Sequence, residues 1–169
     1  GDPTRLPIHL GHLLNAGHTG WKYLKPAAFI YFLDVKNAAG ASSASYGLRG
    51  TGSVDIGEKL NIGYGASYAV QTEWTNNPTN YTAHYTKLDL SLGGIPLFIG
   101  KLAAGWEMLG SDNGNAVFST PLATGHKFNG WADVFLNNGG PNGLRDLYFE
   151  WAPSLPWQLK TRMLYHRFC

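Results

Sequence analysis

The clearest pattern in the sequence is an alternation of apolar with small or polar residues between Leu60 and Gln71. The apolar series is Leu60, Ile62, Tyr64, Ala66, Tyr68 and Val70, and the intervening series is Asn61, Gly63, Gly65, Ser67, Ala69 and Gln71. Successive side chains of a β-strand point to opposite faces of a sheet, so this segment is predicted to be a strand with one apolar face. The glycines inside the segment disfavour a helix.

Related patterns run along the whole chain and predict about eight strands. Alternation is also clear in 101–108 and 146–151, whereas 25–36 is apolar on both faces and leaves its facing open. The predicted strands cover roughly 8–18, 25–36, 44–55, 58–73, 80–93, 96–109, 142–152 and 157–168. A series of strands separated by turn signals indicates an all-β chain.

The links between the predicted strands alternate between short and long. Short links fall at 21–23, 56–58, 93–96 and 153–156, and long links at 37–43, 73–79 and 109–142. In an antiparallel up-and-down arrangement, alternate links lie at opposite ends, so the long loops would share one end. Outer-membrane β-barrels have this layout. A soluble up-and-down barrel shows part of it, so the pattern leaves both structures open.

The segment 109–142 is the longest stretch without a strand pattern, and loops of this length are usually functional or disordered. Several of its apolar residues have helix-like spacing, which predicts a short helix within 127–136. We expect this segment to be an extracellular loop that either narrows a pore as a plug or covers it as a lid. The candidate constriction residues are His126, Lys127, Phe128, Trp131 and Asp133.

The composition narrows the possible classes of protein. Charged residues and aromatic residues each make up 14% of the chain, whereas a typical soluble domain is about 25% charged. No apolar run reaches the roughly 18 residues of a membrane helix, and the net charge of +2 is too small to indicate a nucleic-acid partner. Low charge with many aromatic residues fits a membrane β-barrel, and a soluble β-sandwich or small closed barrel is the alternative.

Aromatic residues are predicted near both ends of the strands. Trp21, Tyr23, Phe98, Trp151 and Trp157 are expected at the short-link end, and Tyr68, Trp74, Tyr81, Tyr85 and Trp106 toward the long-link end. Tyr and Trp prefer the headgroup level of a bilayer, so two such belts favour a membrane barrel. The alternative explanation is that Tyr and Trp are good strand formers.

The sequence offers little for catalysis. The six histidines are scattered, and no cysteine or carboxylate accompanies them at metal-ligand spacing. Nucleophile, phosphate-binding and dinucleotide-binding motifs are missing from the sequence. We therefore expect no enzyme activity, no metal site and no cofactor.

The candidate functional residues are instead charged residues on the predicted inner face. Rings of charge tune which ions pass a pore, and the predicted pore-lining residues are Arg49, Lys87, Asp89, Lys101, Glu107, Asp146, Glu150, Lys160 and Arg162. Basic and acidic residues are nearly balanced in this set, so a self-paired ladder that only hydrates the wall is the alternative. If the set selects anions, neutralising Lys101, Lys160 and Arg162 should weaken the preference.

Several stretches of the sequence resemble one known family. They are 106–114, 118–136 with its Thr-Pro-Leu-Ala-Thr and Phe-Asn-Gly-Trp-Ala-Asp runs, 140–148, 12–16 and 77–81. Over roughly 9–168 the chain resembles the alginate-export-like porins of Gram-negative bacteria. The resemblance implies a transmembrane β-barrel in the cell outer membrane, surrounded by lipid, that passes small solutes or an anionic polysaccharide such as alginate.

Family chains are considerably longer, so we expect 1–169 to be a single β-barrel domain or an internal portion of a larger one. If the portion holds eight strands, they would form an arc of the wall, because eight strands closed by themselves leave an interior nearly filled by side chains. The alternative from a different class is a soluble β-barrel or β-sandwich that binds a carbohydrate through exposed aromatic residues.

Overall fold

The computed structural model describes residues 8–95, 99–120, 140–156 and 159–169. The elements in this part of the chain are β1 (Ile8–Gly17), β2 (Lys25–Val35), η1 (Ala39–Ala41), β3 (Ser43–Ile56), β4 (Leu60–Glu73), β5 (Thr82–Ile95), β6 (Gly100–Leu109), η2 (Gly140–Asn142), β7 (Leu144–Ala152) and β8 (Met163–Phe168). Each of the eight predicted strands is present in its predicted region. The prediction of an all-β chain is therefore confirmed.

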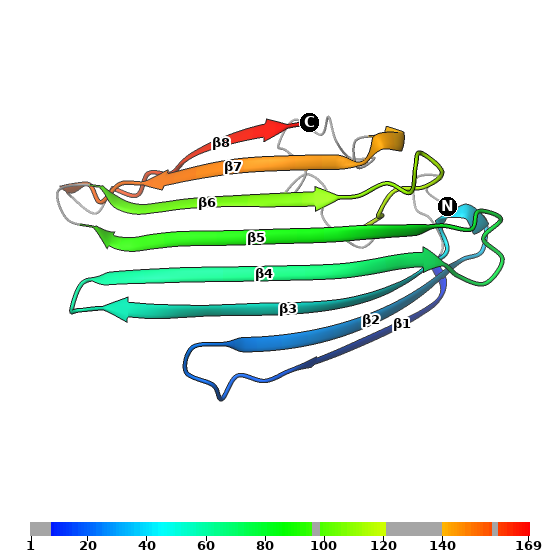
Figure 1. Ribbon diagram of the computed structural model, residues 1–169, viewed down its shortest axis with the longest axis horizontal. Helices are drawn as coiled ribbons and strands as arrows, with labels where there is room; N and C mark the ends of the chain where they lie inside the picture. Colours follow the sequence, from blue (N-terminus) through cyan, green and yellow to red (C-terminus); the bar gives the residue numbers. More distant parts are fainter. Residues whose placement is uncertain (1–7, 96–98, 121–139, 157–158) are drawn as a thin grey trace.

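The eight strands form one antiparallel sheet in the order β1 to β8, so each strand pairs with its neighbours in the chain (Figure 1). This is the predicted up-and-down arrangement. Among the described strands, β1 and β8 are the two edges of the sheet. Closure into a barrel and a place in a membrane stay predictions. No helix in the described residues has the length and apolarity needed to cross a membrane.

The links at the two ends of the sheet differ less in length than the sequence predicts. The last strand begins at Met163 and not near 157, because Lys160 forms an antiparallel bridge with Ser154 within the link itself. The link between β7 and β8 therefore covers 153–162 and is longer than the short link predicted there. We call the end with this link the turn end, and the end where β6 leads into β7 the loop end.

The pairing register divides the side chains between two faces. Tyr64 of β4 pairs with Leu90 of β5, and Leu90 pairs with Ala104 of β6, so these residues share one face. We call this the apolar face. Its exposed large side chains include Leu14, Tyr46, Leu48, Ile56, Tyr68, Leu88, Leu90, Leu102, Leu147, Phe149, Trp151, Met163 and Tyr165. The alternation predicted for β4 is thus confirmed.

The opposite face, which we call the polar face, carries most of the charged residues of the strands, although Arg145 and Arg167, near the loop end, lie on the apolar face. The register also settles the facing of β2, which the sequence leaves open. Phe29 pairs with Gly47 and Tyr31 with Ser45 on the polar face, while Ile30 pairs with Tyr46 on the apolar face.

The sheet is curved, with the polar face on its concave side. A single cavity on this face is lined both by Leu13 of β1 and by Glu107 of β6. In a flat sheet these two strands would lie about 24 Å apart, at about 4.8 Å for each neighbouring pair. Both strands therefore bend toward the shared cavity.

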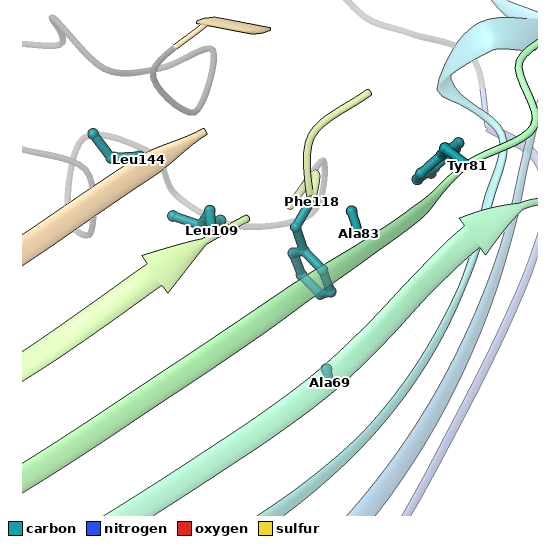
Figure 2. Packing of buried hydrophobic residues seen from close by; sticks show 6 residues of the cluster. All are labelled: Ala69, Tyr81, Ala83, Leu109, Phe118 and Leu144. Atoms are coloured by element: carbon teal, nitrogen blue, oxygen red, sulfur yellow. The ribbon is translucent and has the colours of Figure 1, made fainter. Parts of the chain in front are cut away.

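A small hydrophobic core lies at the loop end of the polar face. It consists of Ala69, Tyr81, Ala83, Leu109, Phe118 and Leu144 (Figure 2). Phe118 comes from the segment that follows β6, and its ring points down onto β5 beside Ala83. The core therefore forms where the long loop folds back over the sheet.

Two glycines of the polar face lie beneath aromatic rings. A Cβ atom at Gly105 would overlap the Tyr148 ring of β7, and a Cβ atom at Gly47 would overlap the Phe29 ring of β2. A ring that lies across a glycine covers backbone that would otherwise be exposed, a device known as aromatic rescue. Glycine is needed at both positions because an aromatic ring of the neighbouring strand occupies the space that a Cβ atom would fill.

Candidate functional site

The polar face brings together seven of the nine charged residues predicted to line a pore: Arg49, Lys87, Asp89, Lys101, Glu107, Asp146 and Glu150. They share a face because each occupies an alternate position of its strand. Four of them lie in one row across the sheet. In this row Arg49 pairs with Ser67, Ser67 with Lys87, Lys87 with Glu107 and Glu107 with Asp146.

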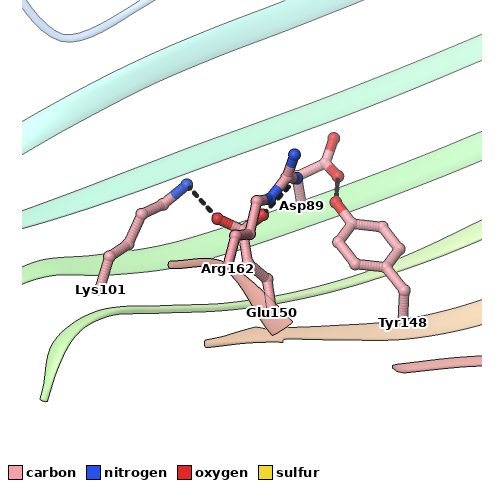
Figure 3. Close-up of polar contacts among 5 residues, drawn as sticks. All are labelled: Asp89, Lys101, Tyr148, Glu150 and Arg162. Carbon is pink, nitrogen blue, oxygen red and sulfur yellow. Dashed lines mark hydrogen bonds and ion pairs between the residues drawn. The ribbon is translucent and has the colours of Figure 1, made fainter. Parts of the chain in front are cut away.

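Toward the turn end, three charged residues form a group around Glu150 (Figure 3). Lys101 Nζ lies 3.1 Å from Glu150 Oε1, and Arg162 Nη2 lies 2.7 Å from Glu150 Oε2. The Glu150 side chain is only 9% exposed, whereas both basic side chains reach water. We call Lys101, Glu150 and Arg162 the Glu150 group. Its two cations share one carboxylate.

Next to this group, Tyr148 links two strands of the polar face. Its hydroxyl donates a hydrogen bond to the Asp89 carboxylate of β5 (Figure 3). Lys87 Nζ lies 5.9 Å from the centre of the Tyr148 ring, within cation–π range. Tyr148 can reach over β6 because Gly105 has no side chain.

Asp146 makes a further side-chain contact on this face. Its Oδ2 atom lies 2.8 Å from His166 Nδ1 of β8, and its Oδ1 atom has no hydrogen-bond partner among the described residues. Asp146 is buried, and Glu107 lies directly across from it on β6. This pair ties β7 to the edge strand β8.

The third group lies nearer the loop end and consists of Arg49, Lys87 and Glu107, which we call the Arg49 group. Glu107 Oε1 accepts a hydrogen bond of 2.6 Å from the Tyr85 hydroxyl. Within the described residues, the carboxylate contacts of this face with basic side chains are those of Glu150 and Asp146. Neither Arg49 nor Lys87 takes part in one, so the cations of this group have no carboxylate partner in that part of the chain.

The segment after β6 is fixed over the polar face by Gln71 of β4. The Gln71 side chain accepts a hydrogen bond from Ser119 N at 2.8 Å and donates one to Ser119 O at 2.9 Å. Its amide nitrogen also donates to Ser45 Oγ at 2.9 Å. Gln71 is 1% exposed. The buried Gln71 amide thus bonds both the N–H and the C=O group of Ser119, as the backbone of a neighbouring strand would.

Further contacts fix the first part of this loop. Ser111 and Val117 form a bridge, Phe118 N donates to Gly110 O at 2.8 Å, and Gly110 N donates to His84 O at 2.7 Å. Tyr81, just before β5, is buried beside this segment. Burial, and to a smaller extent the nearby Glu73 carboxylate, raises the pKa of Tyr81 to about 12. Residues 110–120 are therefore packed on the sheet and not extended away from it.

A cavity of about 540 Å³ lies between this segment and the polar face. Its charged lining residues are the Arg49 group, and its aromatic lining residues are Phe29, Tyr31, Tyr85 and Phe118. The remaining lining residues are Leu13, Asn15, Leu33, Ser45, Ser67, Gln71, Leu109, Ser119 and Thr120. The cavity combines two cations with flat apolar surfaces.

A second hollow, of about 600 Å³, lies on the apolar face over β4 to β8. The apolar-face side chains that line it include Leu90, Leu102, Phe149, Trp151 and Met163. It differs from the first cavity because these side chains offer little for hydrogen bonding.

Some sequence predictions need correction. Lys160 and Arg162 do not belong to β8, because the strand begins at Met163, although Arg162 still reaches Glu150. Tyr81 and Tyr85 do not form an aromatic belt. Tyr81 is buried in the core, and the Tyr85 hydroxyl is bound to Glu107 on the polar face.

The predicted constriction residues His126, Lys127, Phe128, Trp131 and Asp133, and the predicted helix within 127–136, lie outside the described residues. Gln71, Phe118 and Ser119 were not predicted as site residues. The alternation in the sequence places Gln71 on the polar side of its strand, and this is the available signal. Its partner Ser119 is 48 residues away, so no local pattern could connect them.

In the part of the chain that the structure describes, no three residues among His, Cys, Asp and Glu are grouped to hold a metal ion. Comparisons with protein-family models, with curated proteins and with solved structures found no match to this chain.

Proposed function

We propose that this chain forms part of the wall of an outer-membrane β-barrel channel that passes small solutes or an anionic polysaccharide. In this proposal the apolar face contacts lipid, and the polar face lines a water-filled lumen. The observation that carries the proposal is the contrast between the two faces of one sheet. One face exposes large apolar side chains, and the other gathers charged residues around a cavity.

The apolar face supports contact with lipid. Leu48 is 65% exposed and Leu90 is 59% exposed, and similar side chains continue to β8. Soluble monomers rarely expose a continuous apolar surface of this kind. Burying one such side chain contributes about 1.5–3 kcal/mol, so lipid around this face would stabilise the fold strongly. Tyr46 and Tyr68 near the loop end and Trp151 near the turn end fit the two headgroup levels.

The polar face supports a lumen that carries charge. Its basic and acidic residues hydrate the wall, and the sheet curves around them. The segment 118–120 lies over this face, held by Gln71. This position favours a loop that narrows the passage over one that covers it from outside.

The proposal also requires partner strands for both edges of the sheet. Unpaired backbone groups cost several kcal/mol each in the hydrocarbon of a bilayer, so open edges do not occur there. A barrel closed from eight strands has an interior nearly filled by side chains. A passage for a polysaccharide therefore includes further strands beside β1 or β8.

The matched pair Leu90→Arg and Ser91→Arg tests which face meets lipid. These neighbours lie on opposite faces of β5. With the protein folded into phospholipid vesicles, we expect Leu90→Arg to lower the free energy of unfolding by about 2–4 kcal/mol, the cost of a cation on the lipid face near the midplane. Ser91→Arg should have a much smaller effect, because its side chain enters the lumen. Denaturant unfolding of both variants measures this.

The soluble alternative gives the opposite result. In water, Leu90 is already exposed, and an exposed substitution changes stability by about 0.5 kcal/mol or less. Equal stability of the two variants would therefore count against the channel. Release of the protein from membranes by carbonate without detergent would also count against it.

A further inference from the structure

The cavity beneath residues 118–120 has a lining that selects one kind of ligand. Its volume of about 540 Å³ lies in the range of small-molecule sites, which is about 300–1,000 Å³. Strands β1 to β6 and the loop all contribute side chains to it, including Leu13 and Glu107 at its two sides. This is a formed pocket and not a groove between two neighbouring side chains.

Most neutral polar groups of the cavity are already engaged with one another. Asn15 Oδ1 accepts a hydrogen bond of 2.8 Å from the Tyr31 hydroxyl. Gln71 is bound to Ser119 and Ser45, and the Tyr85 hydroxyl is bound to Glu107. A ligand with many hydroxyl groups would find few free partners here. The lining therefore disfavours a sugar ring.

The two basic side chains of the cavity, unlike most of its neutral polar groups, are not hydrogen-bonded to other lining residues in the described part of the chain. Arg49 and Lys87 line it, and neither forms an ion pair within the described residues. Glu107 is the carboxylate of the cavity, and it already accepts the Tyr85 hydroxyl. The cavity thus has an excess of positive charge with donors available to an anion, and Arg in particular can bind a carboxylate with two parallel hydrogen bonds.

The rest of the lining is flat and apolar. Phe29 and Tyr31 stack with ring centres 4.9 Å apart, and Tyr85 and Phe118 lie with ring centres 5.4 Å apart. Leu33 and Leu109 add aliphatic surface. Aromatic rings pack well against such surfaces in offset or edge-to-face arrangements.

We propose that this cavity is a binding site for a small aromatic carboxylate, with its ring among Phe29, Tyr85 and Phe118 and its carboxylate on Arg49 and Lys87. The inference rests on the proposed function in that it assigns a solute class to the same face of the sheet. Binding itself needs only the folded chain. The two proposals can therefore fail separately.

Calorimetric titration of the folded protein in a non-ionic detergent, with ligand-observed NMR as a second readout, tests the site. The probes are benzoate, benzyl alcohol with the same ring but no charge, acetate with the charge but no ring, and glucuronate with a hydroxylated ring. We expect benzoate to bind about tenfold or more tightly than each of the other three, because only benzoate satisfies both the cations and the aromatic surfaces.

Variants locate the binding. Arg49→Gln and Lys87→Gln should each weaken benzoate binding about tenfold, as expected for the loss of one charge-assisted hydrogen bond. Lys101→Gln and Arg162→Gln remove the same charge from the Glu150 group and should leave binding unchanged. Circular dichroism confirms that each variant is folded, and the comparison of the four probes on the unmodified chain does not depend on any variant.

Three results would overturn the inference: no benzoate binding to the folded protein, tighter binding of glucuronate than of benzoate, or equal losses in the Arg49 and Lys101 variants. Benzoate binding without any conductance in bilayers would contradict the channel and leave the binding site standing. Conductance without benzoate binding would contradict the binding site and leave the channel standing.

Discussion

The Arg49 group and the Glu150 group have the same formal charge but different surroundings. Each contains two basic residues and one glutamate. In the Glu150 group both cations are bound to the carboxylate and the group is open to water. In the Arg49 group neither cation has a carboxylate partner within the described residues, and the group lines a cavity together with residues 118–120. Available donors, and not formal charge, therefore mark the candidate anion site.

The largest expected effect comes from releasing residues 118–120, which line the cavity of the Arg49 group. Phe118 is buried in the small core, so Phe118→Ala should lower the free energy of unfolding by about 3 kcal/mol, as for other buried Phe residues. It should also release the loop and raise the channel conductance. Denaturant unfolding and single-channel recording measure the two effects.

Asn115→Ala is the control for this change, because Asn115 is exposed in the same turn. It should alter stability by about 0.5 kcal/mol or less. Equal effects of the two substitutions would show that the segment is not anchored through Phe118, and a fixed segment would no longer distinguish the two groups.

A smaller effect is expected from making the Glu150 group resemble the Arg49 group. Glu150→Gln removes the shared carboxylate and leaves Lys101 and Arg162 with free donors. Because both cations are largely exposed, solvent screening limits the loss of stability to about 1 kcal/mol. The preference of the channel for anions should rise, which the reversal potential in a salt gradient measures. An unchanged reversal potential would mean that this group does not face the lumen.

Much of the fold could be predicted from the sequence because the residue alternation of a strand is visible within the strand's own short segment. The alternation from Leu60 to Gln71 defined both the strand and its two faces, since side chains alternate along any strand. The segment 25–36, which is apolar on both sides, had no such contrast. Its facing became clear only from its pairing with β3, where Phe29 lies across Gly47.

The parts that could not be predicted depend on contacts between distant residues. Tyr85 was expected at a membrane surface, yet its hydroxyl binds Glu107, which follows it by 22 residues. The anchoring of Ser119 by Gln71 depends on the path of the loop. Lys101 and Arg162 had the same appearance in the sequence as Arg49 and Lys87. Only the position of Glu150 distinguishes the paired cations from the unpaired ones.

The reversal potentials of two double variants test whether Arg49 and Lys87 are the cations of the polar face that are available to anions. Arg49→Gln with Lys87→Gln, and Lys101→Gln with Arg162→Gln, each remove two positive charges from the polar face. In a potassium chloride gradient across a planar bilayer, we expect the unmodified channel to prefer anions and the first variant to lose most of this preference, because Arg49 and Lys87 are the cations free to attract chloride. The second should lose little. Equal shifts, a larger shift for the second variant, or no conductance by the unmodified protein would contradict this role of Arg49 and Lys87.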